Sequence, residues 1–153
     1  KEEGRVLLER SIETGAAYEK LLELVEYQDG DIEYVKNPEL LPSAEYVIEV
    51  KSQKEGHVKA LNAEEIGKVA LFLGAGRETL DSKIDLAAGI VLNKKVDDKV
   101  EIGDTLAFVH SNDLEKAKEA EERIRNLYIL GEKNKEDKKL IYGIVSKDGV
   151  QIF

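Results

Sequence analysis

The chain has 153 residues, of which 42% are hydrophobic and 36% charged, and its formal net charge is −9. This acidic balance disfavours nucleic acid and anionic membrane surfaces as partners, and no apolar run approaches the roughly 18 residues of a membrane span. Cysteine is absent, which excludes disulfides and thiolate metal sites and favours a reducing cytoplasm. Methionine is absent as well, including at position 1, and we therefore expect the sequence to begin partway through a longer gene product.

The first 30 residues are predicted to be helical. One apolar stripe with helical spacing consists of Tyr18, Leu21, Leu22 and Val25. Gly15 interrupts an earlier helical stretch, and Gly30 is expected to adopt the left-handed conformation that often follows a helix. Both prolines lie in 37–42, which predicts a boundary between a helical part with its linker, residues 1–44, and a main domain, residues 45–153.

The periodicity changes after this boundary. Alternating apolar and polar residues in 46–50 predict a half-buried strand, and a second strand is expected over 57–61. Asn62 is expected to cap a helix, with Glu65 in the position of a capping box. The apolar positions of that helix are Ile66, Val69, Ala70 and Leu73. Gly74 is expected to end it.

The rest of the main domain repeats this alternation. Strands are predicted over 90–96 and 105–111, and Asn112 with Glu115 is expected to cap a second helix. Its apolar side is predicted to hold Ala117, Ala120, Ile124, Leu127 and Tyr128.

The end of the chain is expected to form a loop over 131–139, a strand over 140–146 and a hairpin turn at 147–149. Throughout the main domain, the strands are short and tight turns join them. This arrangement favours an α+β fold over a doubly wound parallel sheet.

The glycine-rich segment 74–77 lacks the spacing of a phosphate loop. It also follows the predicted helix, whereas anions bind at the opposite, N-terminal end, where the helix dipole is positive. We therefore interpret this segment as a helix cap and tight turn.

The remaining polar residues form no catalytic or metal-binding pattern. His57 and His110 are expected on strands, without ligand spacing around them. Ser111 follows His110 and points to the opposite face of its strand, which excludes a relay between the two. The aspartates expected to be solvated and to form turns are Asp81, Asp85, Asp97, Asp98 and Asp104. We predict that the chain holds no catalytic, cofactor-binding or metal-binding residue.

Residues 96–107 resemble half of the motif of biotinyl and lipoyl carrier domains. Such carriers present one lysine on an exposed hairpin, and the candidates here are Lys94 and Lys95, which are expected on a strand before the motif. The chain continues from Ser111 into a helix instead of a second hairpin, which argues against a carrier. An independent carrier or binding module is the alternative interpretation.

Several segments together resemble the C-terminal domain of pyrimidine-nucleoside and thymidine phosphorylases. In chain order they are residues 46–50 (YVIEV), 56–58 (GHV), 73–77 (LGAGR), 84–96 (IDLAAGIVLNKKV) and 103–107 (GDTLA). The stretch 18–30 is similar to the helix that closes the α/β domain of those enzymes. Asp29 and Asp97 stand where that family usually has glycine. Aspartate tolerates left-handed geometry, so we expect both turns to survive.

The resemblance implies an α/β-hammerhead domain with a biotinyl-like half-motif, preceded by helices from the end of an α/β domain. It also implies a parent enzyme of pyrimidine salvage that cleaves pyrimidine nucleosides with inorganic phosphate, giving the base and a pentose 1-phosphate. In the family, the groups that bind phosphate and base lie upstream, as does the dimer-forming α domain. We therefore expect a structural domain, inactive alone, whose partner is the remainder of a homodimeric parent.

Overall fold

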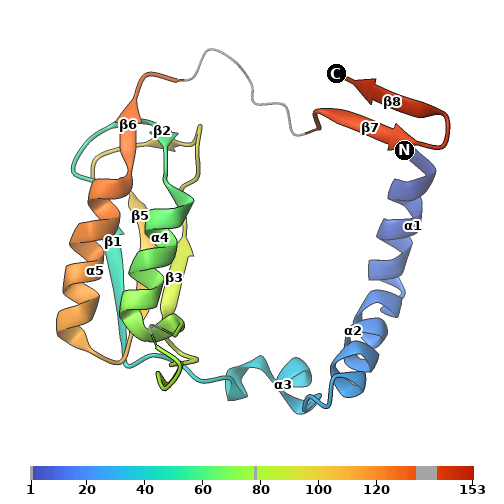
Figure 1. The fold of residues 1–153 in the computed structure, drawn as a ribbon, viewed down its shortest axis with the longest axis horizontal. Helices are drawn as coiled ribbons and strands as arrows, with labels where there is room; N and C mark the ends of the chain where they lie inside the picture. The colour runs from blue at the N-terminus through green and yellow to red at the C-terminus, as the bar shows by residue number, and fades with distance from the viewer. Residues whose placement is uncertain (1, 78, 134–140) are drawn as a thin grey trace. The chain divides into compact units, whose positions relative to one another are not determined.

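A computed structural model describes residues 2–77, 79–133 and 141–153 (Figure 1). The chain divides into two compact units, residues 1–43 and 44–153. The division falls directly after the segment that holds both prolines. Within the described residues, no helix has the length and apolar character that crossing a membrane requires.

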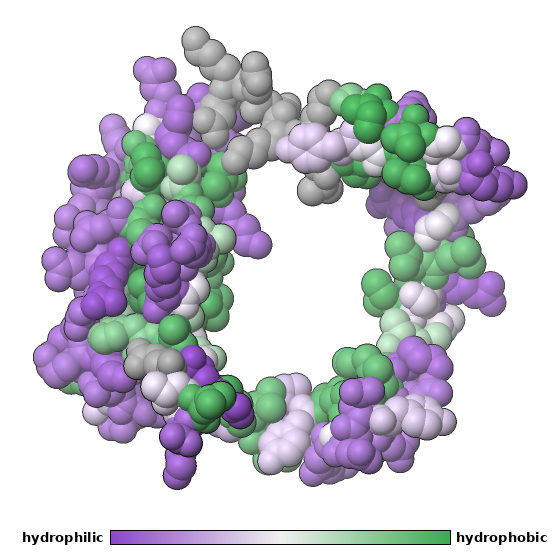
Figure 2. Space-filling view, in the orientation of Figure 1, coloured by the Kyte–Doolittle hydropathy of each residue, from purple (hydrophilic) through white to green (hydrophobic). Residues whose placement is uncertain are grey.

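The first unit consists of helices. They are α1 (Glu2–Glu13), α2 (Ala16–Tyr27), α3 (Glu33–Lys36) and the 3-10 turn η1 (Pro38–Leu40). Gly15, with φ of 76°, separates α1 from α2, which confirms the predicted interruption. None of the side chains described in this unit is buried, and Figure 2 shows apolar surface over α1 and α2.

The end of α2 corrects one prediction, because its left-handed residue is Asp29, with φ of 56°, and not Gly30. The Asp29 amide donates to the Glu26 carbonyl at 3.0 Å. The Gly30 amide donates to the Val25 carbonyl at 2.9 Å, which completes a Schellman motif. Gly30 is needed for space instead, since a Cβ there would lie 2.8 Å from Val25 Cγ1 and 3.0 Å from the Val25 carbonyl oxygen.

The second unit contains two three-stranded sheets. In one, β5 (Thr105–Ser111) lies between β1 (Tyr46–Lys51) and β3 (Gly89–Leu92). In the other, β2 (Gly56–Ala60) lies between β4 (Lys99–Val100) and β6 (Ile129–Gly131). Each strand pairing in the described part of the chain is antiparallel. The fold is therefore mixed α+β, as predicted, and not a doubly wound parallel sheet.

Two helices complete the core of this unit. They are α4 (Ala63–Ala70), which runs into the π turn η2 (Leu71–Ala75), and α5 (Leu114–Leu127). α5 packs against β1 and β5 and contacts α4 (Figure 1). The buried apolar side chains are Val50, Val58, Val69, Leu73, Val100, Leu106, Ala107, Val109, Ala117, Ala120, Ile124 and Tyr128. Among the residues predicted on the apolar side of α5, Ala117, Ala120 and Ile124 are buried, which confirms the orientation of this helix.

The chain ends in a hairpin of β7 (Gly143–Ser146) and β8 (Gly149–Ile152). Its turn is the one predicted at 147–149, and Gly149 has φ of 127°. The start of the predicted strand at 140 and most of the predicted loop over 131–139 lie outside the described residues.

The strand predicted over 90–96 was too long, because β3 ends at Leu92. The amides of Asn93 and Lys94 both donate to the carbonyl of Leu106, at 2.9 and 3.0 Å, so the ladder cannot continue. The short strands β4 and β6 were not predicted, and both pair with β2.

Of the two N-caps predicted for the helices of this unit, one is confirmed and one is wrong. Asn62 caps α4 as predicted, with its side-chain oxygen accepting from the amides of Glu64 at 2.9 Å and Glu65 at 3.3 Å. The prediction of Asn112 as the cap of α5 was wrong. Asp113 is the cap, and its carboxylate accepts from the Glu115 amide at 2.9 Å.

Candidate functional site

The glycine-rich segment 74–77 is a helix end, as predicted. Gly74 has φ of 103° and closes the π turn, and Gly76 is extended. The Gly74 carbonyl accepts the amide of Asp85 at 2.9 Å. The segment thus presents the carbonyl end of a helix, which does not favour a phosphate.

The two histidines lie on different sheets. His57 is on β2, opposite Lys99 and Gly131, and His110 is on β5, opposite Val47 and Gly89. Across the described ranges, no group of three metal-ligating side chains comes together. The histidines therefore do not form one site.

Ser111 is buried and is the last residue of β5. Its hydroxyl lies 3.1 Å from both the amide and the carbonyl of Asp113, so its hydrogen-bonding capacity is used locally. His110 is on the alternate position of the same strand and is only partly buried. The pair has the opposed orientation that the sequence predicted.

The predicted aspartates lie in or beside turns, and Asp97 occupies left-handed backbone in one of them. Three of the five accept a backbone amide there. Asp85, Asp98 and Asp104 accept the amides of Ala87 at 3.0 Å, Lys95 at 2.7 Å and Glu101 at 3.1 Å, respectively. Such bonds satisfy backbone donors at chain reversals.

The lysine candidates for a carrier site, Lys94 and Lys95, follow β3 and do not lie on it. Lys94 Nζ contacts Asp104 Oδ2 at 3.0 Å and donates to the Lys99 carbonyl at 2.9 Å. Its side chain is 23% exposed. Lys94 and the Glu101 amide together lower the pKa of Asp104. An ammonium group held in this way stabilises the fold and is not presented to a ligase, whereas Lys95 is exposed.

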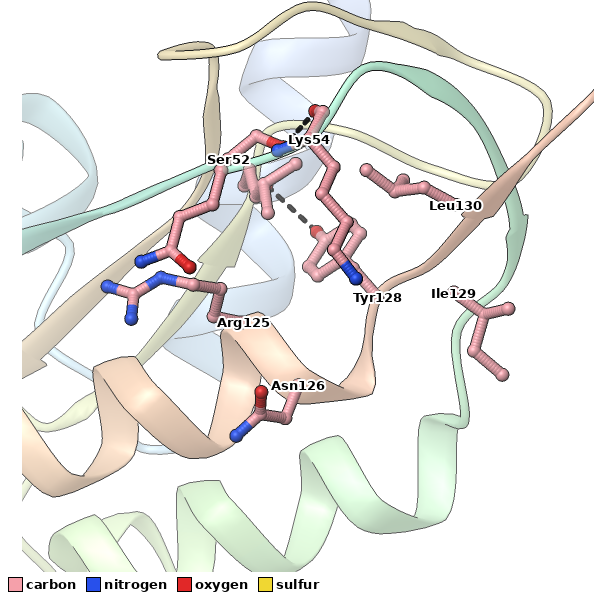
Figure 3. Close-up of a pocket in the computed structure, with 9 residues that line it drawn as sticks. Ser52, Lys54, Arg125, Asn126, Tyr128, Ile129 and Leu130 are labelled. Atoms are coloured by element: carbon pink, nitrogen blue, oxygen red, sulfur yellow. Dashed lines mark hydrogen bonds between the residues drawn. The ribbon is translucent and has the colours of Figure 1, made fainter.

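A cavity of about 310 Å³ in the second unit lies between the β1–β2 turn and the end of α5 (Figure 3). Its apolar lining comes from Leu106, Tyr128, Ile129 and Leu130. Its polar lining comes from Ser52, Gln53, Lys54, Arg125 and Asn126.

Arg125 and Tyr128 in this cavity are engaged by the domain itself. Arg125 is ion-paired with Glu121, and its Nε donates to the Lys51 carbonyl at 3.2 Å. Burial raises the pKa of Tyr128 to about 12. The hydroxyl of Tyr128 lies 2.9 Å from the Lys94 carbonyl and 2.8 Å from the Leu106 carbonyl. Tyr128 therefore stays protonated at neutral pH, and its hydroxyl bonds to backbone carbonyls of the domain itself.

Comparison with known proteins identifies the region around these features. The family model described as "Pyrimidine nucleoside phosphorylase C-terminal domain" matches residues 57–131. The pyrimidine-nucleoside phosphorylase of Staphylococcus haemolyticus is 52% identical over 111 residues, which are 72% of this chain and 26% of that protein. The enzyme of the same name from Staphylococcus aureus (strain USA300) is 50% identical over 111 residues, with the same coverage of both chains. The chain belongs to this family, because residues 57–131 match the family's C-terminal domain.

The matched part of the phosphorylase domain begins and ends on neighbouring strands. His57 opens it on β2 and Gly131 closes it on β6, and these two residues are partners in the sheet. β1 lies outside the match and pairs with β5 inside it. The phosphorylase domain of this chain therefore needs residues before 57 to complete its first sheet. The chain spans about a quarter of the length of its relatives, since 111 aligned residues are 26% of each.

Both departures from the phosphorylase pattern occupy left-handed backbone. Asp29 has φ of 56° and Asp97 has φ of 78°, and no other non-glycine residue in the described ranges has a positive φ. The expectation that aspartate would keep these turns is confirmed. Aspartate adopts this region more readily than most residues because its short side chain can bond locally.

Sequence reasoning missed two tertiary roles in this domain. Asn112 has good capping chemistry, but its side chain bonds to Glu45 and Asp85 instead of capping α5. Tyr128 was expected to be one more apolar residue of α5, yet its hydroxyl joins the turn after β3 to β5. The position of this tyrosine, directly after the last helical residue, is the sequence signal for such a bond. A tyrosine hydroxyl that is buried there needs a hydrogen-bond partner.

Proposed function

We propose that this chain is part of an enzyme that cleaves pyrimidine nucleosides with inorganic phosphate, releasing the base and a pentose 1-phosphate. The observation that carries this proposal is the 50–52% identity, over 111 residues, to proteins named pyrimidine-nucleoside phosphorylase. The chain contains the C-terminal domain of such a protein, and the role of this domain in the parent is structural. The parent is a homodimeric enzyme of the cytoplasm.

The side chains of the domain support a role without direct chemistry. Attack of phosphate on the anomeric carbon needs cationic and hydroxyl donors around phosphate and around the leaving base. Here Lys94 is paired with Asp104, Arg125 is paired with Glu121, and the buried hydroxyls of Ser111 and Tyr128 bond to the backbone. These groups are engaged within the domain, which supports our placing of the reacting groups in the remainder of the parent.

The finer fold assignment belongs to the same proposal. We assign residues 45–153 to an α/β-hammerhead with a biotinyl-like half-motif, and residues 1–44 to the helical end of an α/β domain. The pairing of β4 with β2, and the turn that leads from β4 into β5 of the other sheet, support the half-motif. The exposed apolar surface of α1 and α2 supports a place for these helices within a larger domain.

A carrier or independent binding module is not favoured. Lys94 is partly buried and ion-paired, and the family match covers the half-motif as part of a phosphorylase domain. Co-expression with biotin or lipoate ligase, followed by mass spectrometry, should leave the mass of the chain unchanged. An added cofactor mass on Lys94 or Lys95 would favour the carrier.

The main proposal is tested by transplanting the domain. A chimera would join residues 45–153 to the Staphylococcus haemolyticus enzyme in place of its matching C-terminal region. We expect this chimera to release uracil from uridine in the presence of phosphate. The chain alone should release none, and the relative truncated before this region should lose most of its activity. An inactive but folded chimera, or turnover by the chain alone comparable to that of the full relative, would contradict the proposal.

A further inference from the structure

Asn112 lies at the junction of β5 and α5 and holds two other parts of the second unit. Its side-chain oxygen accepts the amide of Glu45 at 2.8 Å, just before β1 begins. Its side-chain nitrogen donates to Asp85 Oδ2 at 2.9 Å. One planar carboxamide thus bridges residues 67 positions and 27 positions away in the sequence.

Asp85 extends this network on its other side. Its Oδ1 accepts the amide of Ala87 at 3.0 Å, and its own amide donates to the Gly74 carbonyl at 2.9 Å. The bond between Asp85 and Gly74 therefore brings together the two ends of the segment that follows the helix end, and we call this point the base of the segment.

The two bonds of Asn112 depend on one side-chain orientation. A carboxamide that accepts on one edge and donates on the other can satisfy both partners only in one rotamer and one amide orientation. Asn112 is exposed, so each bond alone contributes little to stability. Loss of either bond lets the side chain rotate and weakens the other bond.

We propose that Asn112 couples the start of β1 to the base of the segment between Gly74 and Asp85. Glu45 is the second residue of the second unit, directly after the boundary between the units. A perturbation of the chain at this boundary is therefore transmitted through Asn112 to Asp85, and a perturbation at Asp85 is transmitted back. This coupling does not depend on the proposed reaction.

Asp85→Ala tests the coupling, because it removes the bond of Asn112 to Asp85 and leaves the bond of Asn112 to Glu45 in place. It also removes the turn bond to the Ala87 amide, which the control below matches. Exchange of individual amide protons with water would be measured by NMR on the full chain. In Asp85→Ala, the Glu45 amide should exchange roughly two- to tenfold faster, although Asp85 does not touch it; the range is that of losing one ordinary hydrogen bond. Asn112→Ala should accelerate the exchange of the Glu45, Asp85 and Ala87 amide protons together.

The matched control is Asp98→Ala, which also removes a turn aspartate that accepts a backbone amide, at Lys95, but has no bond to Asn112. This control should leave the exchange rate of the Glu45 amide unchanged. The Val109 amide in β5 exchanges when the whole unit opens, so each exchange rate is divided by that of Val109. A Glu45 ratio unchanged by Asp85→Ala, or unchanged by Asn112→Ala, would overturn the proposal.

Discussion

The two units of the chain contrast in how they bury apolar side chains. Residues 44–153 have a continuous core to which both sheets and α4, η2 and α5 contribute. Residues 1–43 have no buried side chain among those described, although α1 and α2 carry large apolar residues. Helices are stabilised mainly by packing, so the second unit holds the information for its own fold, whereas the first needs apolar surface from elsewhere.

Separating the units gives the largest expected effect. Residues 44–153 alone should unfold cooperatively, with a melting temperature close to that of the whole chain. Residues 1–43 alone should show only weak helical signal, because isolated helices of about 12 residues are marginal in water. Circular dichroism during heating measures both. A cooperative melt of the 1–43 peptide would show that the contrast is wrong.

A pair of identical substitutions measures the contrast at single residues. Ile124 in α5 is 0% exposed and Ile12 in α1 is 75% exposed. Ile124→Ala should lower the free energy of unfolding by about 2–5 kcal/mol, since it removes buried methyl groups and leaves a cavity. Ile12→Ala should change it by less than about 0.5 kcal/mol. Urea denaturation of the whole chain provides both values, and equal effects would contradict the assignment of the core.

Tyrosine hydroxyls offer a smaller and pH-dependent comparison. Tyr128 is 7% exposed and Tyr27 is 78% exposed. Tyr128→Phe should cost about 1–2 kcal/mol at neutral pH, because it removes a buried hydroxyl bonded to two carbonyls. Tyr27→Phe, the control, should be neutral.

The pKa of Tyr128 sets the sign of the alkaline effect. Its pKa is raised from 10.0 in an unfolded chain to about 12 in the folded one. The unfolded state therefore loses its proton first, and stability present below pH 10 is lost as the pH rises toward about 12. Tyr128→Phe should flatten this part of the stability profile. An unchanged alkaline profile in Tyr128→Phe would show that the hydroxyl is not buried.

Local patterns predicted the elements whose stabilising contacts are themselves local. The break at Gly15, the cap at Asn62 and the turn before Gly149 all follow from residues within a few positions of each other. β4 and β6 have two and three residues, and they become strands because β2 pairs with them. Pairing partners distant in the sequence leave no short-range signal.

The capping error has the same physical cause. Asn112 and Asp113 are both good N-caps, and local propensity does not choose between them. Tertiary bonds of Asn112 to Glu45 and Asp85 decide the outcome and leave Asp113 to cap α5. For the candidate sites, residue types and spacing sufficed to explain Gly74 and Ser111 as parts of the fold, whereas the pairing of Lys94 with Asp104 required the structure.

The ion pair of Lys94 and Asp104 gives the smallest expected effect and sharpens the contrast within the second unit. Lys94 lowers the pKa of Asp104, so the pair stabilises the fold above the ordinary pKa of an aspartate, and this contribution is lost as the pH falls through the lowered value. Lys94→Gln should raise the pKa of Asp104 and move acid unfolding to slightly higher pH. The control is Lys95→Gln, at the exposed neighbour, which should change neither. Carboxyl NMR titration of Asp104 measures the shift. A pKa that stays low in Lys94→Gln would mean that the Glu101 amide, not Lys94, holds Asp104 in its charged form.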